Sequence, residues 1–256
     1  MNAAVIADSS LELALAYQPV LDIRGKQPFV CAYESLTRAY CNGESYPIGS
    51  LIRKAEAAGT MPHLDRQVAI KVCQTLLAKP EMKVWFNLSQ QTLESEKHAN
   101  EITEIIHTSA VADRIKVEVT ETHPGSIQQI AKNLKLFRDN SISVVIDDIE
   151  DEHAIVSLLG TDLVTGCKFS RATTEAISHD ESRMAMSSKL VSTCKALGKT
   201  TVLEGIENPY QLEIAQELGV DYVQGWLFWP AMPLSSVPIL GTEVTVLPAY
   251  SIGNHD

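Results

Sequence analysis

Short runs of branched and aromatic apolar residues, each ended by a polar residue, recur along this chain. The clearest is Val144-Val145-Ile146, followed at once by Asp147 and Asp148. Such a run is typical of a parallel strand that is covered on both faces. The pattern predicts strands over residues 17–23, 29–36, 84–87, 115–120, 142–147, 163–168, 200–204 and 222–224. Helical spacing in the intervening stretches predicts helices over residues 48–58, 63–78, 101–109, 127–138, 153–159, 184–197 and 211–218.

Strands that alternate with helices predict an α/β fold with a parallel sheet. The 256 residues match the roughly 250 of a TIM-like (β/α)8 barrel, and a doubly wound open sheet is the alternative. A turn-forming segment, Arg24 to Pro28, separates the first two strands and favours a hairpin, so the first strand is expected to run antiparallel. We expect one domain over residues 1–256 with a core at about 15–233. Residues 234–256 are expected to be a packing segment or a tail.

Composition excludes several classes of protein. The formal charge of −11 argues against DNA or RNA as a partner, because a nucleic-acid groove needs a basic face. An anionic ligand bound through metal cations stays open. Five cysteines without a CxxC pair fit a reduced, cytoplasmic chain. There is no signal-peptide pattern, and no apolar run reaches the roughly 18 residues that a membrane span requires.

Polar residues stand at the ends of most predicted strands: Glu34, Asn87, Glu118, Asp147 with Asp148, Lys168, Glu204 and Gln224. In a parallel barrel these ends open onto one face. Any one acid after a strand is more often a helix cap or a solvated residue, so the inference depends on the repetition. Clustered carboxylates suit Mg²⁺ or Mn²⁺, and two such ions can clamp a displacement at phosphorus. In a regular strand only one of the paired aspartates faces the barrel, unless the chain bends there.

Eight motifs occur in the order in which they occur in the EAL domain family, which this chain resembles over about residues 15–233. They are Tyr17-Gln18-Pro19-Val20, Tyr33-Glu34-Ser35-Leu36-Thr37-Arg38, Phe86-Asn87-Leu88-Ser89, Glu118-Val119-Thr120-Glu121, Asp147-Asp148, Lys168, Glu204-Gly205-Ile206-Glu207 and Val223-Gln224-Gly225. That family comprises bacterial phosphodiesterases that open cyclic di-GMP to linear pGpG. The resemblance implies a barrel with an antiparallel first strand, two Mg²⁺ or Mn²⁺ ions and cyclic di-GMP as ligand.

The resemblance also implies roles for single residues. Metal ligands would be Glu34, Asn87, Glu118 and Asp147 for the first ion, with Asp148 serving the second. Lys168 and Glu204, with Glu34, would form the catalytic group that positions and activates water. Substrate contacts would come from Gln18, Leu36, Arg38 and Gln224, with Arg38 meeting a phosphate. Glu121 would brace the loop that follows the paired aspartates.

The chain departs from the family pattern in two places that bear on activity. Ser170 stands where the family usually has an aspartate, and residues 149–153 read Ile-Glu-Asp-Glu-His in place of Phe-Gly and a small-residue loop. In the family this loop serves the second metal and a dimer contact. Two functions therefore stay open: hydrolysis of cyclic di-GMP, or a catalytically weak or inactive domain that acts as a receptor or protein-binding regulator. A homodimer and a regulatory protein stay open as partners.

An aromatic group, Trp226, Phe228 and Trp229, follows Gln224 closely along the chain. These rings suit stacking on a guanine base. Packing at the barrel rim is the competing interpretation. We expect Cys167, the neighbour of Lys168, to lie on the other strand face as a core thiol.

Overall fold

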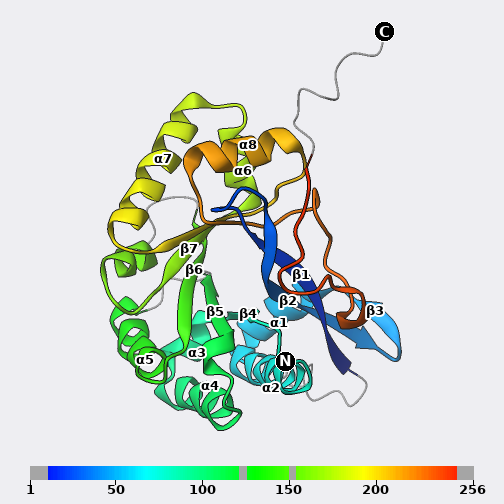
Figure 1. The fold of residues 1–256 in the computed structure, drawn as a ribbon. Helices are drawn as coiled ribbons and strands as arrows, with labels where there is room; N and C mark the ends of the chain where they lie inside the picture. The colour runs from blue at the N-terminus through cyan, green and yellow to red at the C-terminus, as the bar shows by residue number, and fades with distance from the viewer. Residues whose placement is uncertain (1–10, 121–125, 150–153, 247–256) are drawn as a thin grey trace.

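Eight strands close into a barrel in the computed structural model, which describes residues 11–120, 126–149 and 154–246 (Figure 1). The ring order is β1, β9, β8, β7, β6, β5, β4, β2, and the pairing of β1 with β2 closes it. The strands are β1 (Leu11–Asp22), β2 (Phe29–Cys41), β4 (Val84–Leu88), β5 (Ile115–Thr120), β6 (Ser143–Ile149), β7 (Gly166–Phe169), β8 (Thr200–Leu203) and β9 (Tyr222–Val223). Neighbours pair in parallel except around β1, which is antiparallel to both β2 and β9. The predicted barrel with an antiparallel first strand is confirmed, and the open sheet is excluded.

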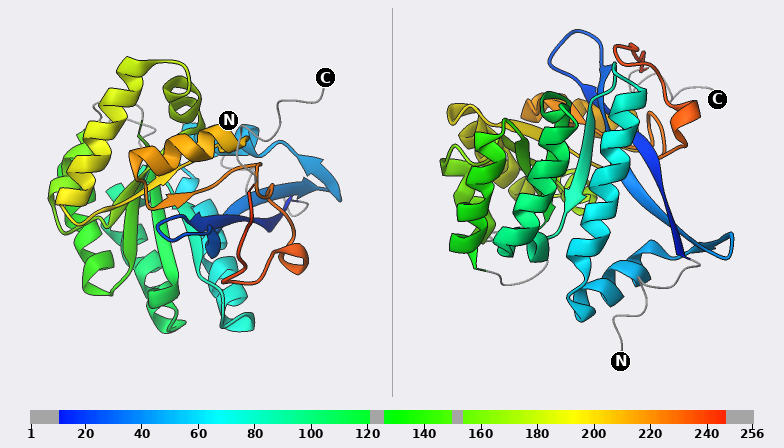
Figure 2. Two further views of the ribbon diagram at one scale, coloured as in Figure 1. Left: turned by 45° about the horizontal axis from the view of Figure 1, so that its top comes forward. Right: turned by 90° about the horizontal axis from the view of Figure 1, so that it is seen from below.

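Helices cover the outer face of the barrel, and their bounds are α1 (Ile48–Ala58), α2 (Met61–Ala78), α3 (Gln90–Glu94), α4 (Glu96–Thr108), α5 (Ile127–Asp139), α6 (Arg171–Ile177), α7 (Glu181–Ala196) and α8 (Pro209–Leu218). Figure 2 shows α2, α4 and α5 side by side along one flank. The branched residues Val117, Val144 and Ile146 are buried in the large cluster beneath these helices. The opposite strand face carries Trp85 and Val202, which form a separate small cluster. The two-residue period of a strand thus separates a helix-covered core from the barrel interior.

The first two strands are longer than their apolar runs predict. Their pairing extends from Asp22 opposite Phe29 to Leu11 opposite Cys41, and β3 (Glu44–Tyr46) adds to the far end of β2. Figure 1 shows this ribbon projecting past the rest of the barrel. The projecting ends mix apolar, polar and half-buried positions, so a search for apolar runs misses them.

Several helices differ from the sequence prediction at their starts. Ser95 and Asp180 accept hydrogen bonds from backbone N–H groups in the first turns of α4 and α7, so both helices begin earlier than their apolar periodicity indicates. The short α3 and α6 are too brief to show a period. The predicted helix over 153–159 is a 3-10 segment, η3 (Ala154–Gly160), and β7 begins at Gly166, three residues later than predicted. Two further 3-10 turns are η2 (Ala112–Arg114) and η4 (Leu234–Ser236).

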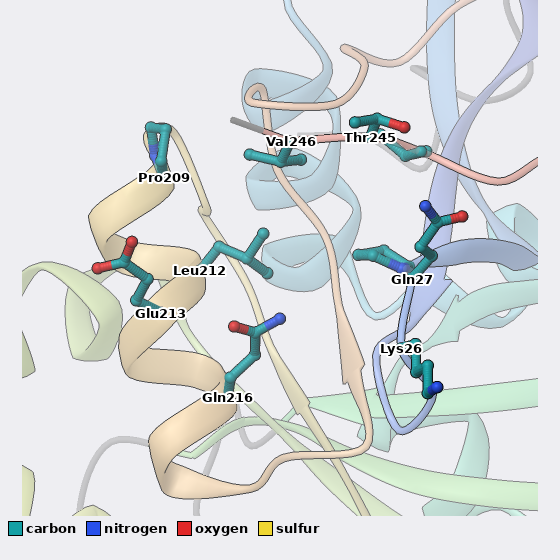
Figure 3. Close-up of a pocket in the computed structure, with 10 residues that line it drawn as sticks. Lys26, Gln27, Pro209, Leu212, Glu213, Gln216, Thr245 and Val246 are labelled. Carbon is teal, nitrogen blue, oxygen red and sulfur yellow. The ribbon is translucent and has the colours of Figure 1, made fainter. Parts of the chain in front are cut away.

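Residues 234–246 run along the start of β2. Val30 N donates to Thr242 O at 2.9 Å, and Tyr33 Oη donates to Pro238 O at 2.6 Å. A groove of about 280 Å³ lies where this segment meets α8 and the β1–β2 turn. Lys26, Leu212 and Val246 are among the residues that line it (Figure 3). The groove contains none of the predicted site residues. Among the described residues, no helix is both long and apolar enough to cross a membrane.

Candidate functional site

Lys168 is the centre of a buried cluster of acids at the carboxyl ends of the parallel strands. Its Nζ lies 2.5 Å from Glu204 Oε1, 2.9 Å from Glu118 Oε1, 3.2 Å from Asp147 Oδ1 and 3.6 Å from Glu34 Oε2. Lys168 and Glu118 are fully buried, and Glu34 and Asp147 are nearly so. β2, β5, β6 and the residue after β8 each bring one carboxylate to the ammonium group. The convergence that the strand ends predict is therefore present.

Three amides surround Glu34: Gln18 on β1, Asn87 on β4 and Gln224 just after β9. Gln224 Nε2 donates to Glu34 Oε2 at 2.7 Å and to Gln18 Oε1 at 3.0 Å. Asn87 Nδ2 donates to Glu34 Oε1 at 3.1 Å. Gln18 Nε2 in turn donates to the carbonyl of Trp229 at 3.1 Å. Both oxygens of Glu34 thus accept hydrogen bonds from amides, one from Asn87 on β4 and one from Gln224 just after β9.

Gly225 makes the placement of Gln224 possible. A Cβ atom at Gly225 would lie 2.0 Å from the backbone oxygen of Ile206, so only glycine fits where the chain leaves β9. The close approach brings the end of β9 against the turn after β8. It therefore sets Gln224 beside the strand end that carries Glu204.

The paired aspartates face the same space because β6 is bent between them. Asp148 has φ = +53°, and the register of β6 with β7 shifts between Ile146 and Ile149. A non-glycine residue with positive φ is uncommon, and aspartate is among those that tolerate it. One carboxylate oxygen from each of Asp147, Asp148 and Glu204 lies within 4.8 Å of the other two. The bend that the sequence left open is present, and both aspartates reach one site.

Burial and mutual repulsion shift the acids of this cluster. Burial, reinforced by the Glu34 carboxylate, raises the pKa of Glu118 well above its ordinary value. Burial also raises the pKa of Glu204 to about 8, although the Lys168 ammonium opposes this shift. Burial alone would lower the pKa of Lys168, but the surrounding carboxylates outweigh it and raise the pKa well above its ordinary value. One ammonium group therefore compensates only part of the negative charge in the cluster.

The cluster fits divalent cations by its donors and its incomplete pairing. Among the described residues, both carboxylate oxygens of Glu118 and Oδ1 of Asp147 are buried without a hydrogen bond of ordinary geometry, although Lys168 lies within ion-pair distance. An unsatisfied buried carboxylate is costly, and a cation relieves that cost. All the side-chain donors are oxygens, the ligand type of Mg²⁺ and Mn²⁺.

Two of the predicted substrate contacts lie further along β2. Leu36 and Arg38 follow Glu34 by two and four residues, on the same strand face and half-buried. Arg38 Nη1 donates to the carbonyl of its neighbour Thr37 at 3.1 Å. Glu121, the expected loop brace, and the divergent residues 150–153 lie outside the described residues.

Of the three aromatic residues after Gln224, two fit the interpretation of packing at the barrel rim and one is exposed. Phe228 and Trp229 are half-buried and pack against the large core cluster. Trp226 has 64% of its surface exposed, and the Arg171 guanidinium lies 5.4 Å from the centre of its ring. Arg171 Nη2 also pairs with Glu207 Oε1 at 2.9 Å. The sequence did not single out Arg171, because an arginine after a strand carries no distinguishing pattern.

Ser170 has a structural role at the position where the family pattern has an aspartate. It is buried, and its Oγ caps α6 by accepting from Thr173 N at 3.3 Å. A serine here caps the helix as an aspartate would, but without adding a charge to the cluster. The departure therefore leaves the local backbone intact.

Comparison with known proteins gives consistent matches over most of the chain. A family model described as EAL domain matches residues 3–231. The oxygen sensor protein DosP of Escherichia coli (strain K12) is 25% identical over 252 residues, covering 94% of this chain and 31% of DosP. The cyclic di-GMP phosphodiesterase NbdA of Pseudomonas aeruginosa is 26% identical over 239 residues, covering 88% of this chain and 30% of NbdA. The chain thus spans less than a third of the length of these two relatives.

Among solved structures, the PaMucR phosphodiesterase in complex with c-di-GMP matches this fold with a TM-score of 0.79. The sequence identity is 21%, and the match covers 91% of this chain and 96% of that one. At that identity the likeness concerns the fold.

Proposed function

The chain belongs to the EAL domain family, and from this premise we propose that its acidic cluster hydrolyses cyclic di-GMP to linear pGpG with two divalent cations. The name of NbdA and the ligand in the PaMucR structure support the choice of substrate. The Lys168 cluster supports the reaction type, because its acids supply the oxygen donors that a hydrolytic metal site needs.

We assign the metal ligands by position in the cluster. Glu34, Asn87, Glu118 and Asp147 would hold one ion, and Asp148 would hold the second together with Asp147 and Glu204. Bound ions would supply Lewis acidity at the phosphoryl oxygens and lower the pKa of a coordinated water. The closeness of oxygens from Asp147, Asp148 and Glu204 supports the proposed position of the second ion. The bend at Asp148 brings its carboxylate to the site.

Lys168 and Glu204 would handle the attacking water. In the net reaction the water oxygen bonds to phosphorus, the bond from phosphorus to one ribose 3′ oxygen breaks, and a proton ends on that oxygen. Glu204 suits the acceptance of the water proton because its side chain is 22% exposed at the rim of the cluster and lies against the Lys168 ammonium group. Lys168 would hold Glu204 and the water in place and offset the developing charge.

The remaining predicted residues would bind or brace. Gln18 and Gln224 would contact substrate from the β1 and β9 side, where their amides already bridge to Glu34. Leu36 and Arg38 would do so from the projecting ribbon, with Arg38 meeting a phosphate. Glu121 would brace the loop after the paired aspartates. A homodimer and a regulatory protein partner stay hypotheses.

The observation that carries the proposal is the placement of four carboxylates from separate strands within 3.6 Å of Lys168 Nζ. The test is chromatographic detection of pGpG from cyclic di-GMP with Mg²⁺ or Mn²⁺. Glu34→Gln keeps the side-chain size but removes a charged ligand, and it should lose turnover. Ser95→Ala, at a helix cap that makes no contact with the cluster, is the matched control and should keep it. Absence of pGpG from wild-type protein over hours, beside an active homologue, would refute hydrolysis.

The altered segment after Asp148 favours a second candidate, a receptor that binds cyclic di-GMP without cleaving it. The run Glu150-Asp151-Glu152 places three acids where the family has a small-residue loop. These acids change the charge beside the second metal position, which hydrolysis requires, so they favour a domain that binds the ligand without cleaving it. Calorimetric titration followed by recovery of intact ligand would support the receptor, and recovery of pGpG would exclude it.

A further inference from the structure

Asp65 is a buried acid that the proposed reaction does not use. It lies on α2 with 3% of its surface exposed, on the same helical stripe as Val68, Ala69 and Val72. A carboxylate among apolar residues is costly unless its oxygens are hydrogen-bonded. Burial raises the pKa of Asp65 to about 6, so the carboxylate is mostly ionised at neutral pH. Among the described residues it makes no ion pair, so hydrogen bonds alone compensate its charge.

One oxygen of Asp65 accepts three hydrogen bonds from a single turn of the chain. Ser89 N donates to Oδ2 at 3.0 Å, Ser89 Oγ at 2.6 Å and Thr92 Oγ1 at 2.5 Å. Ser89 is the N-cap of α3, and its Oγ also accepts from Thr92 N at 3.3 Å. Asp65, on the long and well-packed helix α2, therefore holds the N-terminus of α3 through these hydrogen bonds.

That turn follows a predicted metal ligand directly. Asn87 precedes Ser89 by two residues, at the end of β4. Its own side chain is exposed and donates one hydrogen bond, to Glu34 Oε1 at 3.1 Å. The helix after it has five residues, which is too short to be stable without tertiary contacts. The backbone at Asn87 is thus fixed on one side by the barrel and on the other by Asp65.

We propose that Asp65 is a positioning residue, whose hydrogen bonds to Ser89 and Thr92 hold the β4–α3 turn so that Asn87 faces the metal cluster. The inference rests on the proposed function, because it assumes that Asn87 ligates a metal. Groups that orient metal ligands typically change metal affinity by about 10–100-fold when they are removed. A purely structural brace would lower thermal stability and leave metal affinity unchanged.

The test measures binding of Mn²⁺ alone by calorimetry, without nucleotide. Asp65→Ala removes the acceptor and should weaken Mn²⁺ binding by about 10-fold or more. Asp65→Asn keeps an oxygen that can accept from Ser89, so it should restore most of the affinity. Asp180→Ala removes a comparable aspartate cap, on α7, where Asp180 accepts from Ser182 N and Arg183 N. It controls for lost helix stability and should bind Mn²⁺ as the wild type does.

Two further measurements separate positioning from folding. Combined with Asn87→Ala, the Asp65→Ala change should add little further loss, because both act on one ligand. Hydrogen exchange should show the Ser89 amide losing its protection in Asp65→Ala. Where Asp65→Ala does not fold, Ser89→Ala supplies the same test through the other partner of the hydrogen bond.

The outcomes distinguish this inference from the function on which it rests. Wild-type protein that binds no Mn²⁺ would overturn both. Wild-type protein that binds Mn²⁺ while Asp65→Ala binds it equally well would overturn the positioning role alone. Additive losses in the double variant would also overturn it, because they would place Asp65 and Asn87 in separate effects.

Discussion

Two lysines in the same barrel interior have opposite surroundings. Lys168 is surrounded by four carboxylates. Lys116, on β5 and on the same strand face as Glu118, has its Nζ 4.2 Å from the centre of the Trp85 ring and 5.6 Å from that of Tyr222. Among the described residues, Lys116 makes no ion pair. The two side chains therefore differ in their partners although they share one interior.

The difference decides how each lysine titrates. Burial lowers the pKa of Lys116 to about 8, and the neighbouring charges only partly oppose it. For Lys168 the carboxylates outweigh burial and raise the pKa well above its ordinary value. Aromatic faces attract an ammonium group but do not replace a counter-charge. Partners rather than burial thus set how each lysine titrates, and among the described residues the cluster of acids lies around Lys168.

Of the changes that test this contrast between the two lysines, removal of the Lys168 ammonium group should have the largest effect on stability and turnover. Lys168→Met leaves buried carboxylates without their cation, which costs about 3–5 kcal/mol of stability for a broken buried pair. The metal-free variant should unfold at a clearly lower temperature, and Mn²⁺ should restore part of the loss. Turnover to pGpG should fall by about 100-fold or more.

Thermal unfolding with EDTA and chromatography of the products measure both effects of Lys168→Met. A metal-free variant as stable as the wild type would show that the cluster does not need its ammonium group.

Withdrawal of divalent ions should act next most strongly, and more so as pH rises. The pKa of Glu204 is about 8 in the metal-free fold and near 4.5 in an unfolded chain, so metal-free stability falls as pH rises through this window. Bound ions keep the carboxylates ionised, so their binding releases protons. At a free ion concentration of about 100 times the dissociation constant, bound ions add about 2.7 kcal/mol to the free energy of unfolding.

The pH effect of metal removal is measured as the loss of melting temperature on adding EDTA at two pH values. The loss should be larger near pH 8 than near pH 6. An equal loss at both values would contradict the proton linkage.

Lys116→Met should change the free energy of unfolding less than Lys168→Met does, and in the opposite direction. The folded-state pKa of Lys116 is lowered to about 8 from 10.5, so its charged form disfavours folding below pH 8 and the penalty fades as pH rises to about 10. The methionine variant lacks this penalty and should match or exceed wild-type stability at neutral pH.

Urea unfolding of both proteins across pH 7–10 measures the Lys116 effect. The wild type should approach the variant as pH rises, while Mn²⁺ affinity stays unchanged. A variant less stable than the wild type at neutral pH would show that the cation–ring contact outweighs the burial of the charge.

The smallest effect concerns a thiol beside Lys116. Burial, aided by Asp22, raises the pKa of Cys31 to about 12 in spite of the nearby Lys116 and Arg24. Thiol reactivity follows the thiolate fraction, so Cys31 should alkylate at least about 100-fold more slowly than a free thiol near pH 8. Iodoacetamide labelling with peptide mass analysis measures this rate. Rapid labelling of Cys31 would mean that Lys116 activates its neighbour.

The sequence predicts the barrel and most of the cluster because both follow from strand ends. Glu34, Glu118, Lys168 and Glu204 each follow an apolar run, and closure of the barrel brings the ends together. The bend at Asp148 could not be decided from the sequence, because aspartate tolerates a left-handed backbone but does not require one.

Two other features lay beyond the apolar pattern for different reasons. The helices α3 and α6 are shorter than two turns, and their Ser caps are the only local signal. Asp65 was visible as an acid in an apolar helical stripe, at residues 65, 68, 69 and 72. Its role depends on Ser89 and Thr92, which lie over 20 residues away and are brought near only by folding.

The left-handed backbone conformation at Asp148 is a feature of the site that the residues of the motif do not record. If the strand straightened by one residue, Asp148 would swing to the outer face, and every acid of the family signature would still be read in the sequence. The backbone torsion at Asp148 therefore carries information about the acidic cluster that the letters of the motif do not.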